Sequence, residues 1–378
     1  MKGKSSSKKI KPFKKVLIAN RGEISIRVIR ACIELGINTV AIYSEEDYLS
    51  LHRIKADEAY LIGKGKGPVA AYLDIKGIVE LALDKDVDAI HPGYGFLSEN
   101  PDFAKACGKA GIKFIGPSPE AIYKMGDKAE GRKIAEIVGV PIIPGTKDFV
   151  KDEDEAMEFA EKAGYPLLIK AAYGGGGRGI RICTDKKSLL GQLSEAKLEA
   201  KNAFGNDSIL IEKFLLDPKH IEVQILADEY GNVIHLFERD CSVQRRHQKV
   251  VELAPSITLS SKLKNEIYDA AVKIAKKSNY SNAGTVEFLV DSEQNFYFIE
   301  MNTRIQVEHT VTEMITGVDL VKAQIRIAEG YSLNDPEMGI PPQEKIEIRG
   351  NSIQCRITTE NPNENFRPDI GYINAYRS

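Results

Sequence analysis

A run of four glycines, residues 174–177, stands between two short apolar segments at 167–171 and 180–183. Such a run is entropically costly to order, so a fold keeps it where the backbone must move or lie close to a ligand. Arg178 inside the loop and Lys170 before it supply positive charge, which predicts a ligand that carries phosphate. Two predicted strands frame the loop and no G-K-[ST] follows it, which excludes a Walker-type loop. A flexible linker is the alternative interpretation.

Two carboxylates lie in successive predicted strands. Glu287 lies within the first strand, Glu300 ends the second, and Asn302 follows it. The polar residues 291–295 can reverse the chain, so Glu287 and Glu300 would face one another if the strands pair. Buried carboxylates need a counter-charge, and a hard cation such as Mg²⁺ binds one or two carboxylates together with substrate phosphates. Two solvent-facing strand residues are the alternative.

A basic and an acidic residue, Arg304 and Glu308, follow this candidate metal site at a spacing of four. A guanidinium binds a small planar anion through two parallel hydrogen bonds. A carboxylate beside such an anion can act as its general base. The alternative is a surface ion pair.

Two further segments are rich in groups that bind anions. The polar run 238–249, which contains Gln244, His247 and Lys249, is expected to sit between strands, with a solvated face as the alternative. The loop 91–99 holds two glycines and a proline after a predicted parallel strand, where open sheets bind ligands. It could equally be a structural turn. Arg356, expected in a buried strand, means little alone.

Alternating strands and helices along the first 125 residues must position these groups. Their predicted order is strand 16–19, helix 23–34, strand 39–43, helix 75–83, strand 87–90, helix 101–110 and strand 114–115. This order predicts an open parallel α/β sheet with helices on its faces. The turn after the first strand is not G-x-G-x-x-G, so a nicotinamide-binding Rossmann site is excluded.

Beyond residue 142 the predicted segments are shorter and carry hairpin signals. The predicted strands are 167–171, 180–183, 209–214, 222–226, 233–237, 285–290 and 296–300, and the predicted helices are 186–203, 261–277 and 313–329. We expect residues 143–208 to form a small inserted lid.

Composition excludes several classes of protein. Of the 378 residues, 43% are hydrophobic and 28% charged, which is typical of a globular protein of two or three domains. No apolar run approaches the roughly 18–20 residues of a membrane helix. Seven lysines fall in the first fifteen residues, so the rest of the chain is acidic, which argues against nucleic-acid binding. The five cysteines lack zinc-type spacing, so we expect no zinc site, no disulfide and a cytoplasmic location.

Taken together, these segments resemble the biotin carboxylase family of ATP-grasp enzymes. The resemblance covers residues 14–378 and includes Ile-Ala-Asn-Arg-Gly-Glu-Ile, His-Pro-Gly-Tyr-Gly-Phe-Leu-Ser-Glu, Glu-Arg-Asp-Cys-Ser-Val-Gln-Arg-Arg-His-Gln-Lys and Glu-Met-Asn-Thr-Arg-Ile-Gln-Val-Glu-His. The fold that it implies has a basic leader (1–14), an N-terminal open parallel α/β domain (15–125), an ATP-grasp domain (126–330) with a small mobile lid at about 143–208, and the start of a C-terminal domain (331–378).

The resemblance also implies a role for each matching residue. For ATP, Lys128 and Lys170 would bind the phosphates, Gly176 and Gly177 would lie in the flap over them, and Glu212, Lys213, Leu215, His220, Gln244, His247 and Leu289 would bind the rest of the nucleotide. For the metal and bicarbonate, Mg²⁺ or Mn²⁺ would be held by Glu287, Glu300 and Asn302, and bicarbonate by Lys249, Arg304, Gln306 and Val307. Glu308 would deprotonate bicarbonate, and Arg356 would stabilise the biotin enolate.

The implied activity is ATP-dependent carboxylation of biotin through carboxyphosphate. Biotin would be a substrate on a carrier domain, a carboxyltransferase domain would use the product, and the family commonly forms homodimers. Segments such as residues 235–243 are most similar to the pyruvate carboxylase group, whereas 301–303 is closer to the bacterial acetyl-CoA carboxylase subunit. Alternatives are a propionyl-CoA carboxylase, another ATP-grasp ligase, or an ATP-binding module without turnover. Because the family region continues beyond residue 378, we expect a fragment that binds ATP better than it turns it over.

Overall fold

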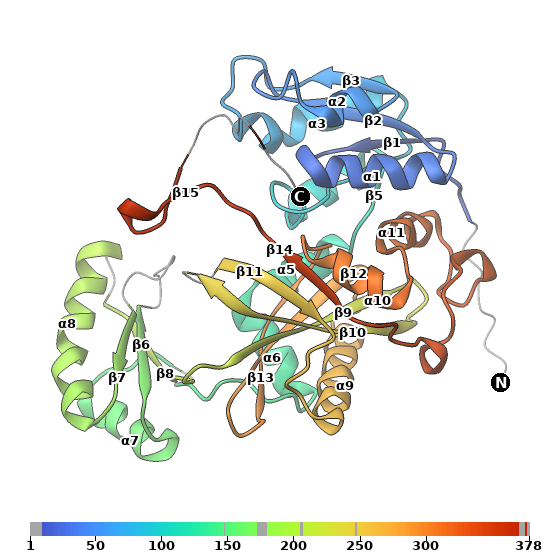
Figure 1. Cartoon of the computed structure of the whole chain (residues 1–378). Coiled ribbons are helices and arrows are strands. Elements are labelled where there is room, and N and C mark those ends of the chain that lie inside the picture. The colour runs from blue at the N-terminus through green and yellow to red at the C-terminus, as the bar shows by residue number, and fades with distance from the viewer. Residues whose placement is uncertain are drawn as a thin grey trace.

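The computed structural model of the chain describes residues 10–146, 148–171, 180–204, 207–245, 248–369 and 375. The described residues form a five-stranded, a three-stranded and a six-stranded sheet, with a further two-stranded ribbon. The five-stranded N-terminal sheet lies above the six-stranded sheet in Figure 1, and the three-stranded sheet lies to the side. The predicted combination of an α/β part with antiparallel sheets is confirmed.

The N-terminal sheet is parallel throughout and has the order β3-β2-β1-β4-β5. Its strands are β1 (Lys15–Ile18), β2 (Asn38–Tyr43), β3 (Glu58–Leu61), β4 (Ala89–His91) and β5 (Lys113–Phe114). The strand order reverses between β1 and β4, and the loops that follow these two strands lie side by side. Asn20, after β1, donates from Nδ2 to the carbonyl oxygens of Pro92 (2.7 Å) and Tyr94 (2.8 Å), after β4. This is the position at which open sheets bind ligands.

Helices cover both faces of this sheet, as the continuous apolar character of its strands predicts. The helices of this region are α1 (Gly22–Glu34), α2 (Leu51–Lys55), α3 (Ile75–Asp84), α4 (Pro101–Lys109) and α5 (Pro119–Gly126). On β1, Val16 packs into the core that contains α1 and α11 (Leu320–Glu329), whereas Leu17 packs into the core that contains α3 and α4.

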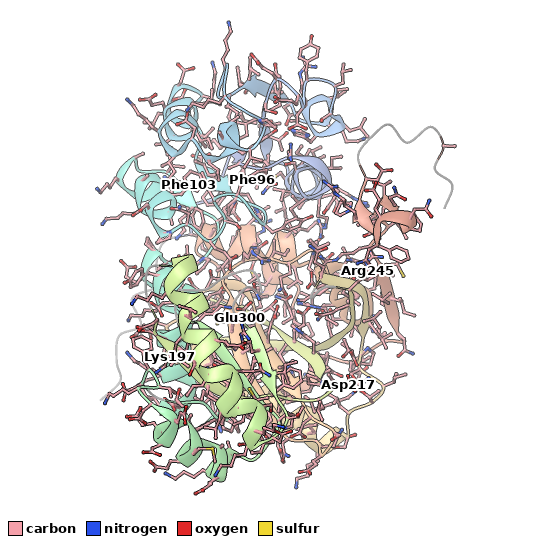
Figure 2. All side chains as sticks on the ribbon, turned by 90° about the vertical axis from the view of Figure 1, so that its left-hand side faces the viewer. Phe96, Phe103, Lys197, Asp217, Arg245 and Glu300 are labelled. Atoms are coloured by element: carbon pink, nitrogen blue, oxygen red, sulfur yellow. The ribbon has the colours of Figure 1, made fainter. Side chains whose placement is uncertain are left out.

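The three-stranded sheet is antiparallel and has the order β7-β6-β8. It consists of β6 (Leu167–Ala171), β7 (Ile180–Cys183) and β8 (Ile209–Lys213), with α7 (Glu153–Ala163) and α8 (Lys186–Phe204) on one face. Figure 2 shows α8, which carries Lys197, on the outer side of this sheet. β8, which follows the predicted lid of residues 143–208, supplies the third strand of this sheet. The glycine run between β6 and β7 lies outside the described residues.

The six-stranded sheet is antiparallel and has the order β13-β12-β9-β10-β11-β14. Its strands are β9 (Lys219–Ala227), β10 (Val233–Arg245), β11 (Gln248–Ala254), β12 (Asn282–Val290), β13 (Phe296–Asn302) and β14 (Ser352–Cys355). Along β9, Ile221, Val223 and Ile225 pack with α9 (Ser261–Lys277) in one core, so the alternating Glu222 and Gln224 point to the opposite face. The remaining α-helices and strands are α6 (Lys128–Ile137), α10 (His309–Thr316), β15 (Glu360–Asn361) and β16 (Arg367–Pro368).

Three sequence predictions of this region are wrong. The helix expected over 313–329 is two helices, because Gly317 in the left-handed conformation (φ 73°) ends α10 and Asp319 caps α11. The polar run 238–249 does not sit between strands but lies largely within β10 and β11, where Arg239 is fully buried. Arg356 follows β14 and is about one-third exposed, rather than lying in a buried strand.

Two further properties of the described residues bear on the sequence predictions. No described helix combines the length and the apolar character that crossing a bilayer requires. All five cysteines are free thiols, four of them buried.

Three histidines are held in their neutral form by the fold. Burial lowers the pKa of His91 to about 3 and the pKa values of His235 and His309 to about 4. The unfolded chain takes up these protons near pH 6.5, so it binds more protons than the folded chain below that pH. The free energy of unfolding should therefore fall as the pH drops from about 6.5 towards the folded-state values.

The His235→Phe variant tests this origin of acid sensitivity. Phenylalanine keeps the stacking on Tyr268 (ring centroids 4.3 Å apart) but cannot take up a proton. Between pH 7 and pH 5 we expect the variant to lose roughly 1–2 kcal/mol less unfolding free energy than the parent chain. Urea titrations followed by circular dichroism measure the difference. An unchanged dependence on pH would contradict the assignment.

Candidate functional site

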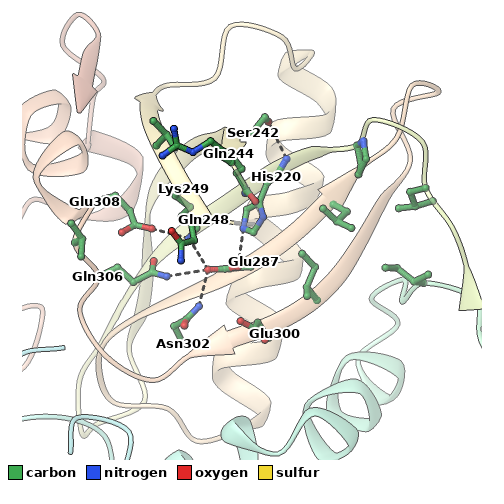
Figure 3. Close-up of a pocket in the computed structure, with 18 of the residues that line it drawn as sticks. His220, Ser242, Gln244, Gln248, Lys249, Glu287, Glu300, Asn302, Gln306 and Glu308 are labelled. Atoms are coloured by element: carbon green, nitrogen blue, oxygen red, sulfur yellow. Dashed lines mark hydrogen bonds and ion pairs between the residues drawn. The ribbon is translucent and has the colours of Figure 1, made fainter. Parts of the chain in front are cut away.

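A cavity of about 1250 Å³ lies between the inner face of the three-stranded sheet and the polar face of the six-stranded sheet. Figure 3 shows its six-stranded-sheet side, where side chains from β9, β11, β12 and the segment after β13 converge. It also receives Tyr94 and Gly95 from the loop after β4. Every sequence-predicted site residue within the described part of the chain lines this cavity: Lys128, Lys170, Glu212, Lys213, Leu215, His220, Gln244, Lys249, Glu287, Leu289, Glu300, Asn302, Arg304, Gln306, Val307, Glu308 and Arg356. The predicted Gly176, Gly177 and His247 lie outside the described residues.

The two carboxylates that are predicted to bind a metal face one another as expected. β12 and β13 are antiparallel, and Glu287 is the register partner of Glu300. Glu287 is buried, and its Oε1 accepts hydrogen bonds from Nδ2 of Asn302 (2.8 Å) and Nε2 of Gln306 (3.0 Å). Glu300 is about one-third exposed and pairs with the ammonium of Lys128 at 3.3 Å. The alternative of two solvent-facing strand residues is therefore wrong for Glu287.

These residues fit a divalent cation by the chemistry of their donors. Glu287, Glu300 and Asn302 present oxygen ligands on the wall of one polar cavity, which is the donor type that Mg²⁺ requires. Among the described residues, Glu287 lies in a group with His220 and Glu222 whose ligand atoms are within 4.8 Å of one another.

One ammonium joins three buried carboxylates at the centre of the site. Nζ of Lys249, on β11, lies 2.5 Å from Glu222, 2.9 Å from Glu287 and 2.7 Å from Glu308. We call these four residues the Lys249 cluster. Burial by itself lowers the pKa of Lys249, but the three carboxylates outweigh it, so the pKa is raised overall. The ammonium is therefore charged at neutral pH.

Two carboxylates of the cluster, those of Glu287 and Glu222, are ionised for the matching reason. Burial raises the pKa of Glu287, but the hydrogen bond from His220 and the charge of Lys249 bring it below its usual range. Burial likewise raises the pKa of Glu222, and the charges of Arg239 and Lys249 lower it overall. Two opposing effects also act on His220. Burial lowers its pKa, but the contact with Glu287 at 2.8 Å outweighs burial, so the pKa is raised overall.

Arg304 and Glu308 both reach the cavity, but they do not pair with each other. Nε of Arg304 donates to Oε2 of Glu99 (2.8 Å), and its Nη2 donates to Oδ1 of Asn302 (3.0 Å). Glu99 comes from the loop after β4, so the N-terminal sheet holds this arginine. Glu308 is 2% exposed and meets Lys249 and Nη2 of Arg356 (2.9 Å). The predicted alternative of a surface ion pair is therefore wrong.

Arg356 joins the site through two carboxylates. Its Nε donates to Glu252 at 2.6 Å while its Nη2 donates to Glu308. Burial raises the pKa of Glu252, and the charge of Arg356 opposes the rise without cancelling it. The guanidinium is thus fixed at the cavity wall beside the Lys249 cluster.

The opposite wall of the cavity comes from the three-stranded sheet. Lys170 pairs with Glu212, which also accepts from Nη1 of Arg132 at 2.8 Å. Burial raises the pKa of Glu212, and the charge of Lys170 lowers it overall. Two residues predicted to meet different parts of a nucleotide therefore pair with each other. Apolar lining comes from Leu215 and Leu289.

Sequence reasoning missed Glu222, Arg239, Glu252 and Glu99. Glu222 and Gln224 alternate with apolar residues in β9, and this period of two is a signal for one polar strand face. Arg239 belongs to the polar run whose position was predicted wrongly. Glu99 ends the loop 91–99. The glycines and the proline of this loop predict a ligand site, but they give no role to Glu99.

Two family models match the chain. The model of the biotin carboxylase N-terminal domain matches residues 12–122, and the model of the carbamoyl-phosphate synthase L chain ATP-binding domain matches residues 127–336. The chain is 58% identical to human mitochondrial pyruvate carboxylase over 97% of its own length and 31% of the relative's. It is 57% identical to pyruvate carboxylase of Bacillus subtilis over 97% and 32%. The chain thus spans about a third of the length of these curated relatives.

The chain matches a larger share of one solved structure than of these curated relatives. The biotin carboxylase domain of Hydrogenobacter thermophilus 2-oxoglutarate carboxylase, a dimer in complex with MgADP, ADP and bicarbonate, is 54% identical to this chain. It has a TM-score of 0.83, and the match covers 95% of this chain and 77% of that one.

Replacing Lys249 should leave three buried carboxylates without their shared counter-charge. We expect Lys249→Gln to lower the free energy of unfolding by about 3–5 kcal/mol at pH 7, because uncompensated buried charges are costly. The loss should be smaller at pH 5, since carboxylates whose pKa values rise can then protonate. Urea titrations at both pH values measure this.

Lys133→Gln is the matched control, because Lys133 forms an exposed ion pair with Glu130 (2.7 Å). Its effect should stay below about 1 kcal/mol. A Lys249→Gln chain as stable as the parent at pH 7, or equally destabilised at both pH values, would contradict the electrostatic description of the cluster.

Proposed function

The chain belongs to the biotin carboxylase family, and from this premise we propose that it uses ATP and bicarbonate to carboxylate biotin borne by a carrier. The observation that carries the proposal is that residues suited to three tasks line one cavity. Carboxylates for a metal, cations for a small anion and the carboxylate Glu308 all line it. The MgADP and bicarbonate of the Hydrogenobacter thermophilus domain support the same ligands here.

ATP would lie between the two sheets that form the cavity. Lys128 and Lys170 would bind its phosphates, so Lys170 would exchange its contact with Glu212 for a phosphate oxygen. The flap glycines Gly176 and Gly177 would cover the phosphates. The rest of the nucleotide would contact Glu212, Lys213, Leu215, His220, Gln244, His247 and Leu289.

Glu287, Glu300 and Asn302 would hold Mg²⁺ or Mn²⁺, which when bound neutralises phosphate charge. The protein's own cations add to that neutralisation. Charge stabilisation of this kind is the main requirement of phosphoryl transfer.

Bicarbonate would be held by Lys249, Arg304, Gln306 and Val307, beside the carboxylate Glu308. Glu308 would take the bicarbonate proton as general base. A bicarbonate oxygen then forms a bond to the γ-phosphorus, the bond from phosphorus to the ADP oxygen breaks, and carboxyphosphate results.

Carboxyphosphate then breaks at its carbon–oxygen bond to give carbon dioxide and phosphate. The phosphate takes the proton from biotin N1, and the resulting enolate, stabilised by Arg356, forms its new bond to carbon dioxide. Both steps need a cavity closed to water, because carboxyphosphate hydrolyses readily, and a glycine flap would provide that closure.

The proposal extends to domains, partners and compartment. The N-terminal domain would span 15–125, the ATP-grasp domain 126–330 and the next domain begin at 331. A biotin carboxyl carrier and a carboxyltransferase would act with the chain, which would form a dimer as the Hydrogenobacter thermophilus domain does.

The carboxyl acceptor would be pyruvate, supported by 57–58% identity to pyruvate carboxylases. The second candidate is 2-oxoglutarate, which the solved relative favours. A cytoplasmic location agrees with five free thiols.

ADP release tests the reaction. With MgATP, we expect it to depend on bicarbonate and to rise when free biotin is added. Glu308→Gln should lower the rate at least about 100-fold, as expected for loss of a general base. Glu266→Gln, in an exposed contact with Lys262 on α9, is the control and should leave the rate unchanged.

The outcomes separate the alternatives. ADP release that requires ammonia would favour a ligase of the carbamoyl-phosphate synthase type. Release that ignores bicarbonate, or a fully active Glu308→Gln variant, would overturn the proposal. ATP binding without any release would indicate a module that binds without turnover.

A further inference from the structure

We propose that Arg239, which lies beneath the cavity, is a positioning residue that sets the geometry of the bicarbonate site. It would act through Gln306 on one side and through Glu222 and Lys249 on the other. The proposal rests on the proposed function, because it assigns Arg239 to the site where that function places bicarbonate.

The guanidinium of Arg239 is fully buried and all of its hydrogen-bonding capacity is used. The side chain on β10 is 0% exposed, as is its ion-pair partner Glu222. Its donor–acceptor contacts are Nε to Glu222 Oε1 (2.5 Å), Nη1 to Gln224 Oε1 (2.8 Å) and Thr312 Oγ1 (3.0 Å), and Nη2 to Thr285 Oγ1 (3.1 Å) and Gln306 Oε1 (2.9 Å). A guanidinium has five N–H donors, so each donor has an acceptor.

The contact with Gln306 fixes the direction of its amide. Because Oε1 of Gln306 accepts from Arg239, its Nε2 donates towards the cavity side, to Oε1 of Glu287 at 3.0 Å. Figure 3 shows this amide beside Glu287 and Lys249. Without Arg239, the buried amide loses the partner that distinguishes its oxygen from its nitrogen. The donor offered to an anion would then no longer be fixed.

The contact with Glu222 fixes the ammonium of Lys249. Glu222 accepts from Arg239 through Oε1 and from Lys249 through Oε2, each at 2.5 Å. The Glu222 carboxylate therefore lies between two cations, and the position of Arg239 constrains the position of Lys249 through it. Loss of Arg239 would leave three carboxylates around a single ammonium, which would draw Lys249 towards Glu222 and away from the anion.

A purely structural role is the competing explanation, since a buried ion pair whose partner is removed destabilises any fold. The two roles differ in what they change. A structural role lowers stability and affects the nucleotide and bicarbonate alike. A positioning role weakens the binding of bicarbonate selectively. Arg239 contacts Gln306 directly and Lys249 through Glu222, whereas Lys128 and Lys170 pair with other carboxylates.

Arg239→Lys keeps the charge but offers three donors instead of the planar set of five. We expect the KM for bicarbonate to rise at least tenfold while the KM for MgATP changes less than about threefold. Arg326→Lys is the matched control, because Arg326 is a half-buried arginine that pairs with Glu329 away from the cavity (3.0 Å). Its kinetic constants should equal those of the parent chain.

Thr285→Val carries the same test if Arg239→Lys does not fold. It removes one acceptor from the Nη2 group that holds Gln306, with little change in side-chain volume. A rise of about threefold or more in the KM for bicarbonate, with the KM for MgATP unchanged, is expected. Equal changes in both constants, or none in either folded variant, would overturn the positioning role.

Bicarbonate binding separates this inference from the proposed function. Line broadening of ¹³C-bicarbonate in the presence of MgADP measures a dissociation constant without turnover. We expect Arg239→Lys to weaken it at least tenfold. If the parent chain binds bicarbonate but never cleaves ATP, the proposed function fails while the variant still decides the role of Arg239. If the parent chain binds no bicarbonate, both are overturned.

Discussion

The need to pair buried charges is the constraint on which the rest of the site depends. Lys249 is 14% exposed and faces three carboxylates that are buried almost completely. Each member of this cluster depends on its partners, because a buried charge without a counter-charge is costly. The six-stranded sheet satisfies the constraint by bringing β9, β11 and β12 into register beside the segment that follows β13. Arg239, buried beneath the cavity, adds a second positive charge to the pairing through its contact with Glu222.

Stability alone does not explain such a cluster. Apolar side chains of similar volume commonly stabilise a fold as well as a buried ion pair does. What the charges add is a set of groups already oriented towards the cavity before a ligand arrives. The pairs at its edge, Lys170 with Glu212 and Lys128 with Glu300, offer cations that can exchange a carboxylate for a phosphate oxygen. Binding of an anionic nucleotide with its metal would then replace one set of charge pairs by another.

The parallel N-terminal sheet takes part in the site through loops at one edge. Asn20 ties the loop after β4 to the turn after β1. That loop brings Tyr94 to the cavity and Glu99 to Arg304. Proper placement of Arg304 therefore depends on the packing of one sheet against the other, which links folding of the N-terminal region to the completeness of the site.

Local patterns in the sequence were enough to predict most elements, because each has a clear period. Helix α9 has the predicted bounds, and the hairpin of β12 and β13 places Glu287 opposite Glu300 as expected. Partners far apart in the chain could not be predicted. Glu99 and Arg304 are 205 residues apart, and Arg239 and Gln306 are 67 apart. The charge density of the polar run 238–249 favoured a segment between strands, although long-range pairing places most of it within β10 and β11, where Arg239 is buried.

Transfer of an oxygen atom tests the central claim, that bicarbonate and ATP react directly in this cavity. The chain is incubated briefly with MgATP, biotin and bicarbonate labelled with ¹⁸O, and the released phosphate is analysed by mass spectrometry. Attack of bicarbonate on the γ-phosphorus, followed by breakage of the carbon–oxygen bond, predicts that the phosphate carries one ¹⁸O atom. Unlabelled phosphate, while the remaining bicarbonate keeps its label, would show that water is the nucleophile and would contradict the claim.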